Sequence, residues 1–425
     1  MPPSQPRDSL ALRVNRRFFY GWVMLGVAAL GMFASGPGQS HIFSVFILPI
    51  GHDLGISHTS VSSAYALATL VAAFGLPWVG RLVDRYGVRP ILLSVAVLLG
   101  FAAMAFGAVT GMVTLALGFA ALRFLGQGSL MLCSANLVAQ WFNRKRGFAL
   151  SLMGLGFSLT MAAHPPLAQW LIDQLGWRAA WFWLGILTWL LLVPVVAILV
   201  ESKPENLGLQ PDGDADDHGD RAAGVQGADV GLTIGEAVRT PAFWIIALSL
   251  ATFSMLVTGL FFHQVSIFQS AGLGPQMAAW VFPISALTMV LAMPVFGRLL
   301  DRVPTKPMFA CAMLTMTAAM LALVSVDDAA TAALYGIAFG INNAAVHTHM
   351  TYVWPRFFGR RHLGSIQGTS QTIAVVGASV GPLPLGVAFD LYGAYTGALL
   401  MLAGLPVLCS IAILLMRPPQ LESGA

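Results

Sequence analysis

Residues 76–85 read LPWVGRLVDR, and residues 293–302 read MPVFGRLLDR. Gly80 and Gly297 hold the same place in these two stretches, 217 residues apart, and four further pairs keep the same separation. These pairs are Gly147 and Gly364, Pro165 and Pro382, Asp173 and Asp390, and Gly176 and Gly393. A constant separation at several places indicates a duplicated chain whose halves share one topology. Parallel repeats of this kind place a substrate site between the halves.

The composition excludes several classes of protein. Of the 425 residues, 57% are hydrophobic and only 9% are charged, whereas soluble domains carry about 25% charged residues. Disordered chains are less hydrophobic and more charged. The cysteines Cys133, Cys311 and Cys409 match no metal-site spacing, and the chain lacks the phosphate-binding loop of ATP-driven pumps. The composition therefore predicts an integral membrane protein without metal or cofactor.

Apolar runs that are long enough to cross a bilayer, about 20 residues each, recur along almost the whole chain. We expect helical spans at Phe18–Ile50, Ser57–Val79, Ile91–Val109, Val113–Phe142, Gly147–Ile172, Ala179–Val200, Thr240–Gln269, Pro275–Phe296, Pro307–Val326, Ala330–Arg356, Gly364–Leu391 and Ala394–Met416. The predicted fold is all-α, with twelve transmembrane helices in two pseudo-symmetric bundles of six.

The domain organisation follows from these spans and from the polar stretch between the sixth and the seventh. We expect a tail at residues 1–17, six-helix bundles at 18–200 and 240–416, a linker at 201–239 and a tail at 417–425. Alternate loops carry 20 of the 22 basic residues. Because basic loops stay in the cytoplasm, both termini and the linker are predicted to be cytoplasmic, in a bacterial inner membrane. We expect a monomer.

The loop after the second span carries a family signature. Residues 80–92 read GRLVDRYGVRPIL, which resembles the G-x-L-a-D-R-x-G-x-K/R-x-x-L motif of major facilitator superfamily transporters. Residues 17–22 (RFFYGW) and 204–213 (PENLGLQPDG) are similar to the monocarboxylate-transporter-like branch. This resemblance implies gating by Gly80, Asp84, Arg85 and Gly87 and, in the second copy, by Gly297, Asp301 and Arg302. It implies that Asp84 caps a helix of the opposite half.

Substrate chemistry must come from the few polar residues inside the spans. Every Asp and Glu falls in a tail, a loop or a helix end, whereas Arg123 lies inside the fourth span. An arginine at the centre of a transmembrane helix costs about 2.5–3.5 kcal/mol on insertion scales, so it usually faces a cavity and a partner. Backbone carbonyls, water or a bound anion could each match Arg123. Gln127 lies one helical turn further on.

Histidines and amides complete the predicted substrate site. His41 and His263 occupy similar positions in the first and seventh spans, and Asn343 and His347 share one face of the tenth. Asn342 and His349 share another face of that helix, and only one face can point straight into a cavity. The predicted substrate-binding residues are Arg123, Gln127, His41, His263, Asn343, His347 and Gln371.

Three functional hypotheses remain. The first is a secondary or facilitative transporter that moves a small organic anion by alternating access, with protons as a candidate coupling ion carried by histidine or by the substrate. The second is a transporter of a neutral planar solute, such as a vitamin or nucleobase, or an efflux permease. The third is a non-transporting membrane receptor. No catalytic residues are predicted, so the chain is not expected to be an enzyme, and it has no basic face for nucleic acid.

Overall fold

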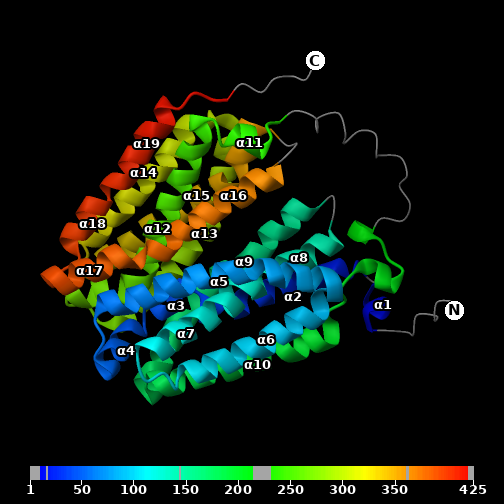
Figure 1. The fold of residues 1–425 in the computed structure, drawn as a ribbon, viewed down its shortest axis with the longest axis horizontal. Helices are drawn as coiled ribbons and strands as arrows, with labels where there is room; N and C mark the ends of the chain where they lie inside the picture. The colour runs from blue at the N-terminus through cyan, green and yellow to red at the C-terminus, as the bar shows by residue number, and fades with distance from the viewer. Residues whose placement is uncertain (1–9, 16–17, 143–144, 214–230, 360–362, 420–425) are drawn as a thin grey trace. The chain divides into compact units, whose positions relative to one another are not determined.

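The structure, a computed structural model, describes residues 10–15, 18–142, 145–213, 231–359 and 363–419 (Figure 1). In these residues the regular structure is helical, and β-pairing is limited to one isolated bridge between Gly231 and Gly359. The chain divides into two compact units. Unit 1 comprises Met1–Ile42 and Val71–Asp217, and unit 2 comprises Phe43–Leu70 and His218–Ala425.

Unit 1 holds most helices of the first half of the chain. They are α1 (Leu10–Asn15), α2 (Gly21–Ala34), η1 (Gly36–Gly38), α6 (Val88–Phe106), α7 (Met112–Leu122), η2 (Arg123–Leu130), α8 (Met131–Trp141), α9 (Arg146–Leu175), α10 (Trp177–Leu199), η3 (Pro204–Leu207) and η4 (Pro211–Gly213). Two helices, α3 (Ser40–Phe43) and α5 (His58–Tyr86), begin in one unit and end in the other.

Unit 2 holds α4 and the helices of the second half. They are α4 (Ile47–Leu54), α11 (Ile234–Ala237), α12 (Pro241–Ser270), α13 (Pro275–Arg302), α14 (Thr305–Val324), α15 (Ala329–Phe358), α16 (Leu363–Val380), α17 (Pro382–Tyr392), α18 (Thr396–Leu402) and α19 (Gly404–Leu415). Residues 43–70 therefore pack with the second half of the chain, although the sequence repeat assigns them to the first. The predicted bundle boundaries at 18–200 and 240–416 stay a prediction.

The described residues contain eleven helices that are long and apolar enough to cross a membrane, together with the shorter apolar helix α2. They coincide with the predicted spans from the second to the twelfth, and the all-helical membrane fold is confirmed. The exact number of twelve crossings stays a prediction, because the first predicted span is not one helix. It consists of α2, η1, α3 and α4 in succession.

The interruption of the first span has a local cause in the sequence Ser35-Gly36-Pro37-Gly38. Proline has no backbone N–H to continue a helix, and glycine loses more conformational freedom than other residues when it is held in one. The chain forms one turn of 3₁₀-helix at η1 and becomes extended at Gln39, where φ is −93° and ψ is 147°. The backbone N–H and C=O groups at this break therefore leave the α-helical hydrogen-bond pattern, although the segment around them is apolar.

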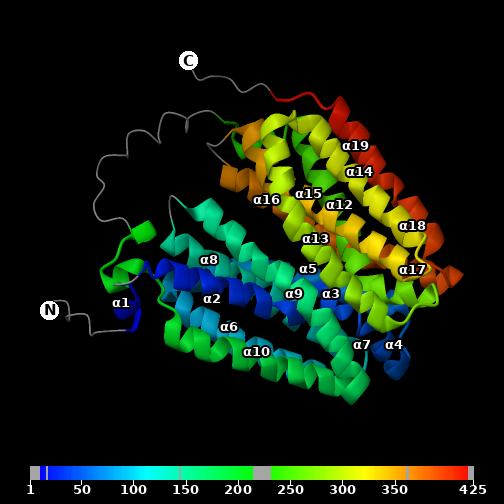
Figure 2. The same ribbon diagram turned by 180° about the vertical axis from the view of Figure 1, so that it is seen from behind.

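Within each unit the helices pack side by side over long stretches. In unit 1, α6 runs along α10 and α2 runs along α9; in unit 2, α14 runs beside α18 and α19 (Figures 1 and 2). Helix α15 begins at a capping box in which Thr331 N donates to Asp328 Oδ1 at 2.8 Å. Hydrogen bonds from Thr331 also lower the pKa of the Asp328 carboxyl. The charged form of Asp328, which is the better cap, is therefore retained at neutral pH.

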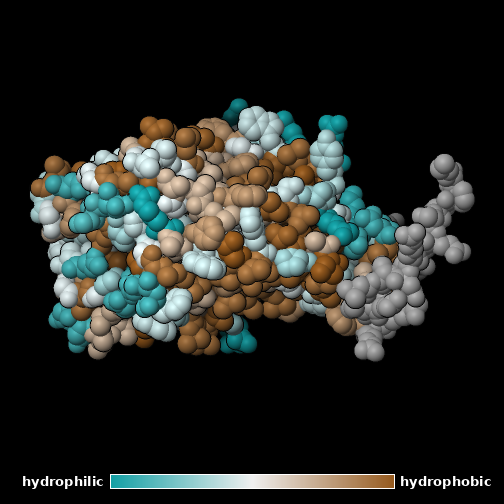
Figure 3. All heavy atoms as spheres, turned by 90° about the horizontal axis from the view of Figure 1, so that it is seen from below, coloured by the Kyte–Doolittle hydropathy of each residue, from teal (hydrophilic) through white to brown (hydrophobic). Residues whose placement is uncertain are grey.

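The surface carries many exposed apolar side chains, as expected of a protein that lies in a membrane. Large side chains such as Phe74 and Leu190 are 77% and 69% exposed. Figure 3 shows hydrophobic residues predominating over the middle of one face, with hydrophilic residues gathered toward its ends. Contiguous apolar patches of this kind mark membrane-facing surfaces.

Candidate functional site

The interrupted first span faces a second irregularity in unit 1. The fourth span changes from α-helix to π-helix at η2, which begins at Arg123. A π-helix is rare, occurs mostly as a single turn inside an α-helix and is frequent at functional sites. Gly38 and Gly126 let the two irregular segments touch, because a Cβ atom on Gly38 would lie 2.7 Å from Gln127 N. Two unusual backbone segments are thus in direct contact.

Arg123 lies at this contact and is only 4% exposed. Its Nη1 donates a hydrogen bond to the carbonyl oxygen of Gly38 at 3.1 Å and lies 3.4 Å from Ser40 Oγ. Both oxygens are neutral acceptors, and these two contacts help to hold the guanidinium in place. The helix break supplies the carbonyl, because Gly38 ends the 3₁₀ turn rather than continuing a helix.

The other predicted residues of unit 1 lie near the same segments. His41 is 1% exposed, and its ring makes an edge contact with Phe157 of α9, at 5.9 Å between centroids. Gln127 is half-buried within η2. Gln39, which sequence reasoning missed, donates from Nε2 to Ser35 Oγ at 2.9 Å and so fixes the extended residue of the break.

His164 is also part of this region, as a packing residue. Its Nδ1 lies 2.8 Å from Thr160 Oγ1, and its ring lies against Phe33. A Cβ atom on Gly36 would lie 2.6 Å from His164 Cγ. The imidazole therefore occupies the space that a side chain at Gly36 would need.

Unit 2 contains a second polar cluster, around the start of α5. His263 on α12 is fully buried, and its Nε2 lies 3.0 Å from the carbonyl oxygen of Pro382 and 3.2 Å from Ser62 Oγ. The rings of His58 and His263 are stacked at 6.2 Å with an interplanar angle of 17°. His58 Nδ1 lies 3.1 Å from the Tyr395 hydroxyl. Burial raises the pKa of Tyr395, so this hydroxyl keeps its proton at neutral pH.

A carboxylate completes this cluster. Asp390 on α17 accepts hydrogen bonds from His58 N at 3.2 Å and from Thr59 N at 2.7 Å. It thereby caps the first turn of α5, where backbone N–H groups have no partner within the helix. A negative charge at a helix N-terminus is also favoured by the helix dipole. We call His58, Ser62, His263, Asp390 and Tyr395 the α5 latch.

The remaining predicted residues of unit 2 differ in their surroundings. Asn343 is buried, and its Nδ2 donates to Phe339 O of its own helix at 2.8 Å. His347 is half-buried and contacts Phe253 of α12, whereas His349 is fully buried and stacks on Phe309 of α14. Gln371 is exposed. Of these residues, His347 on α15 is the one whose ring contacts α12.

The predicted gating residues lie in the second half of α5, between α5 and α6, and toward the end of α13. Asp84 and Arg85 are exposed at the end of α5, and Arg85 lies over the ring of Tyr86 at 5.2 Å. Gly87 has a φ of +85°, which side-chain-bearing residues rarely adopt, and it separates α5 from α6. Gly80 and Gly297 have open space at the Cβ position, and Arg302 is exposed. The side chain of Asp301 lies outside the described residues.

Sequence comparison places the chain in a family. The profile of the Major Facilitator Superfamily matches residues 28–382 and 263–425. The chain belongs to the Major Facilitator Superfamily. Monocarboxylate transporter 13 of Bos taurus is 25% identical over 404 residues, which cover 94% of this chain and 89% of that protein. The oxalate:formate antiporter of Oxalobacter formigenes is 24% identical over 396 residues, covering 89% and 87%.

Solved structures agree with this assignment at the level of the fold. The nucleoside transporter NupG superimposes with a TM-score of 0.71 at 12% identity, covering 94% of this chain and 100% of that one. The predicted superfamily membership and the likeness to monocarboxylate transporters are confirmed. The chain is therefore a multi-pass membrane transporter rather than an enzyme, and its substrate is a small molecule.

Proposed function

We propose that this transporter carries a small organic anion with a carboxylate group and that Arg123 binds this group. The observation that carries the proposal is the guanidinium of Arg123, 4% exposed, held at the contact between an interrupted helix and a π-helix. An arginine inside the membrane is costly, so the arginines that occur there usually face a cavity and a partner and mark a functional site. Its planar fork of N–H donors matches the geometry of a carboxylate.

Backbone geometry supports a binding role at this place. Non-helical backbone at membrane depth is tolerated where it is buried in protein or lines a cavity. Discontinuous helices form the substrate sites of many secondary transporters, because their open backbone groups can bind a ligand. The break at Ser35–Gly38 and the π-helix at Arg123 both have this character. Gln127 lies within the π-helix and His41 lies on α3, directly after the break, and both would contact the substrate from there.

The names of the relatives support the same class of substrate. Monocarboxylate transporter 13 and the oxalate:formate antiporter are named for carboxylates, and each aligns over at least 87% of its own length. NupG, named for nucleosides, is 12% identical and supports only the fold. We therefore extend the carboxylate class, and not the neutral solute, to this chain.

In this proposal the two six-helix bundles alternate between states open to either side of a bacterial inner membrane. Both termini lie in the cytoplasm, the side of the basic loops, and the transporter acts as a monomer. Asp84 and Arg85, with their counterparts Asp301 and Arg302, control the cytoplasmic opening, and Gly80, Gly87 and Gly297 allow the helices to approach. His347, Asn343, Gln371 and His263 are the candidate contacts from the second bundle.

Uptake into proteoliposomes tests the proposal. The probes are radiolabelled lactate, oxalate and uridine, which represent a monocarboxylate, a dicarboxylate and a neutral heteroaromatic solute. We expect uptake of a carboxylate and a loss of about 10- to 100-fold in Arg123→Ala, because a hydrogen bond to a charged group contributes about 1.5–3 kcal/mol.

Arg178→Ala is the matched control for this substitution. Arg178 lies in the same unit and also donates from Nη1 to backbone carbonyls, those of Gly107 and Val109. This variant should keep its uptake, because Arg178 is the second residue of α10 and so lies at the end of its helix, whereas Arg123 lies in the middle of the fourth span. Uptake of uridine alone, or full carboxylate uptake by Arg123→Ala, would contradict the proposal.

A further inference from the structure

The α5 latch joins segments that the sequence repeat assigns to different halves. His58 and Ser62 lie on α5, in the first repeat, whereas His263, Asp390 and Tyr395 belong to the second. Residues 55–57, which connect α4 to α5, include no basic residue. We therefore assign this connection to the side of the membrane opposite the basic loops. A Cβ atom on Gly386 would lie 2.7 Å from Ser62 Oγ, so α17 and α5 are in close contact here. The latch therefore closes the end of unit 2 that lies away from the basic loops.

The hydrogen bonds of His263 determine its tautomer. A carbonyl oxygen can only accept, so the 3.0 Å contact with Pro382 O requires a proton on Nε2. In the neutral ring Nδ1 then carries a lone pair. This atom is buried and has no hydrogen-bond partner. A buried acceptor without a donor is uncommon in native structures and calls for an explanation.

Protonation of that atom is incompatible with the closed latch. An imidazolium needs an acceptor for each of its two N–H groups and a medium that solvates its charge. His263 is 0% exposed and is surrounded by the rings of Phe262, His58 and Tyr395. Asp390, the carboxylate of the latch, already accepts from two amides of α5. Water would become available to the ring only if α5 moved away.

We propose that His263 is the proton-binding residue of this transporter and that protonation of Nδ1 opens the α5 latch. The proton comes from water and binds to the lone pair of Nδ1, while Nε2 keeps its own proton, so that the ring becomes a cation. A ligand that binds one of two states more tightly shifts the population toward that state. Acid therefore favours separation of α5 from α12 and α17. This inference rests on the proposed transport function, for which it supplies the coupling ion.

The other titratable groups around His263 act differently. On α5, a positive charge on His58 would attract the Asp390 carboxylate that caps the same turn, which tightens the latch. On α17, protonation of Asp390 would weaken its two accepted hydrogen bonds and so would also open it. Tyr395 keeps its proton, and Tyr335 of α15 hydrogen-bonds to the neighbouring Gln264. Protonation of Asp390 would thus also open the latch in acid, so an experiment must distinguish the effect of Asp390 from that of His263.

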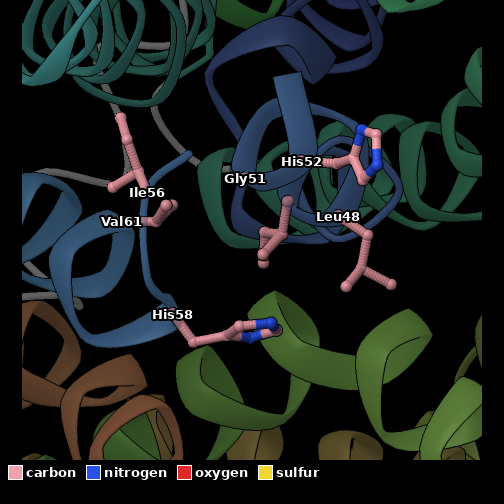
Figure 4. A pocket seen from close by; sticks show the side chains of 7 residues that line it. Leu48, Gly51, His52, Ile56, His58 and Val61 are labelled. Atoms are coloured by element: carbon pink, nitrogen blue, oxygen red, sulfur yellow. The ribbon is translucent and has the colours of Figure 1, made fainter. Parts of the chain in front are cut away.

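A cavity lies beside the latch, and His58 is the latch residue that lines it. It has a volume of about 130 Å³ and is lined by residues of α4 and α5, among them Leu48, His52 and His58. Figure 4 shows the rings of His52 and His58 on opposite sides of this space. A volume of this size can hold water, which needs only about 10–15 Å³ of the same measure. His58 is thus the member of the latch through which water would first enter.

Distances between spin labels test the proposal on the purified protein without any substrate. Labels are placed at Leu67→Cys on α5 and Met401→Cys on α18, which are 61% and 81% exposed, after replacement of the three native cysteines. We expect a longer-distance population to grow as the pH falls from about 8 to about 5, the range in which histidine titrates. If one group titrates, the ratio of the long-distance population to the short-distance population changes by at most about tenfold per pH unit.

Three variants assign this response to one residue. His263→Gln, which cannot titrate, should keep the short distance at both pH values. His349→Gln removes another fully buried histidine of unit 2, which contacts α14 rather than α5, and should respond as the parent does. Asp390→Asn imitates the protonated carboxyl, so it should raise the long-distance population already at pH 8. A further rise of that population on acidification assigns the response to His263, even if His263→Gln fails to fold.

Three results would overturn the proposal: no change of distance with pH in the parent, an undiminished response in His263→Gln, or a lost response in Asp390→Asn. Because no substrate is present, each result is independent of whether Arg123 binds an anion. A normal acid response together with unaffected uptake in Arg123→Ala would refute the anion site and leave the latch standing.

Discussion

The backbones of Gly38 and Gly126 lie in direct contact, so that a Cβ atom built on Gly38 would lie only 2.8 Å from the Cα of Gly126. One glycine ends the break in the first span, and the other lies in the π-helix that begins with Arg123. The contact brings the Gly38 carbonyl within hydrogen-bonding distance of the guanidinium. The position of Arg123 therefore depends on the absence of side chains at these two residues.

Substitution of Gly126 by alanine should damage both stability and transport. A Cβ atom at this residue would lie 2.9 Å from Gly38 N and 3.1 Å from Ser35 O, both backbone atoms that cannot rotate away. Overpacking of this kind costs about 1–3 kcal/mol. We expect a lower melting temperature in detergent and reduced carboxylate uptake by the fraction that remains folded.

Gly154→Ala is the matched control for Gly126→Ala. Gly154 lies inside α9 of the same unit, and nothing is within 4 Å of its Cβ position. Alanine there should be neutral or stabilise the helix by up to about 1 kcal/mol, because glycine is the weaker helix former. Equal melting temperatures for the two variants would show that the contact between Gly38 and Gly126 is looser than described.

Gly36 and His164 should behave as a coupled pair. Alanine at Gly36 would collide with the imidazole of His164, whereas His164→Ala would remove the obstacle together with the hydrogen bond to Thr160. We expect each single variant to be destabilised and the double variant to be more stable than the sum predicts. Coupling energies between residues in contact are about 0.5–3 kcal/mol.

Unfolding in mixed micelles measures this coupling. Gly26→Ala combined with His164→Ala is the reference cycle, because Gly26 lies on α2 with nothing within 4 Å of its Cβ position. That cycle should be additive. Additivity in the Gly36 cycle as well would refute a packing role for His164 against the break.

The sequence predicts the helices of this protein more readily than their interruptions. From the second span onward, the predicted spans coincide with observed helices, because an apolar run of about 20 residues has few alternatives in a bilayer. The break at Gly36-Pro37-Gly38 lies inside the predicted run Phe18–Ile50. Its signal was present in the sequence, since glycine and proline mark helix ends. Hydropathy alone does not detect it, because these residues add no charge.

The π-helix at Arg123 and the α5 latch lie beyond what the sequence can predict. No turn residue marks the π-helix other than Gly126 and Gly128, which are common in membrane helices. Asp390 was conspicuous only as the repeat partner of Asp173, and its hydrogen bonds to α5 join residues more than 300 positions apart. The sequence also left His347 and His349 as alternatives, which the structure separates through their contacts with α12 and α14.

Asp390→Ala should loosen the first turn of α5. The substitution removes the acceptor of His58 N and Thr59 N. Loss of a helix cap costs about 0.5–2 kcal/mol, so hydrogen exchange of these amides should become about 2- to 30-fold faster. Mass spectrometry of the peptide that covers residues 55–65 measures this change.

Asp328→Ala provides the comparison for this measurement. Asp328 also caps a helix of unit 2, namely α15, but it bonds to Thr331 of that helix and not to a distant segment. Its loss should accelerate exchange at the start of α15 and leave residues 55–65 unchanged. Unaltered exchange in α5 after Asp390→Ala would show that Asp390 does not hold the latch.

Arg123→Lys should separate the charge of the arginine from its geometry. Lysine keeps a positive charge but presents a compact ammonium in place of a planar fork of donors. The hydrogen bond to Gly38 O and the contact with Ser40 Oγ use one nitrogen of the fork, Nη1. The compact ammonium of a lysine would have to bind the substrate carboxylate with the same nitrogen that contacts Gly38 O and Ser40 Oγ. Substrate binding would therefore compete with these two contacts. We expect the carboxylate KM in proteoliposomes to rise about tenfold or more, since one hydrogen bond to a charged group contributes about 1.5–3 kcal/mol. The same KM in Arg123→Lys and in the parent would mean that charge alone recognises the anion, and a loss as complete as in Arg123→Ala would mean that the fork is indispensable.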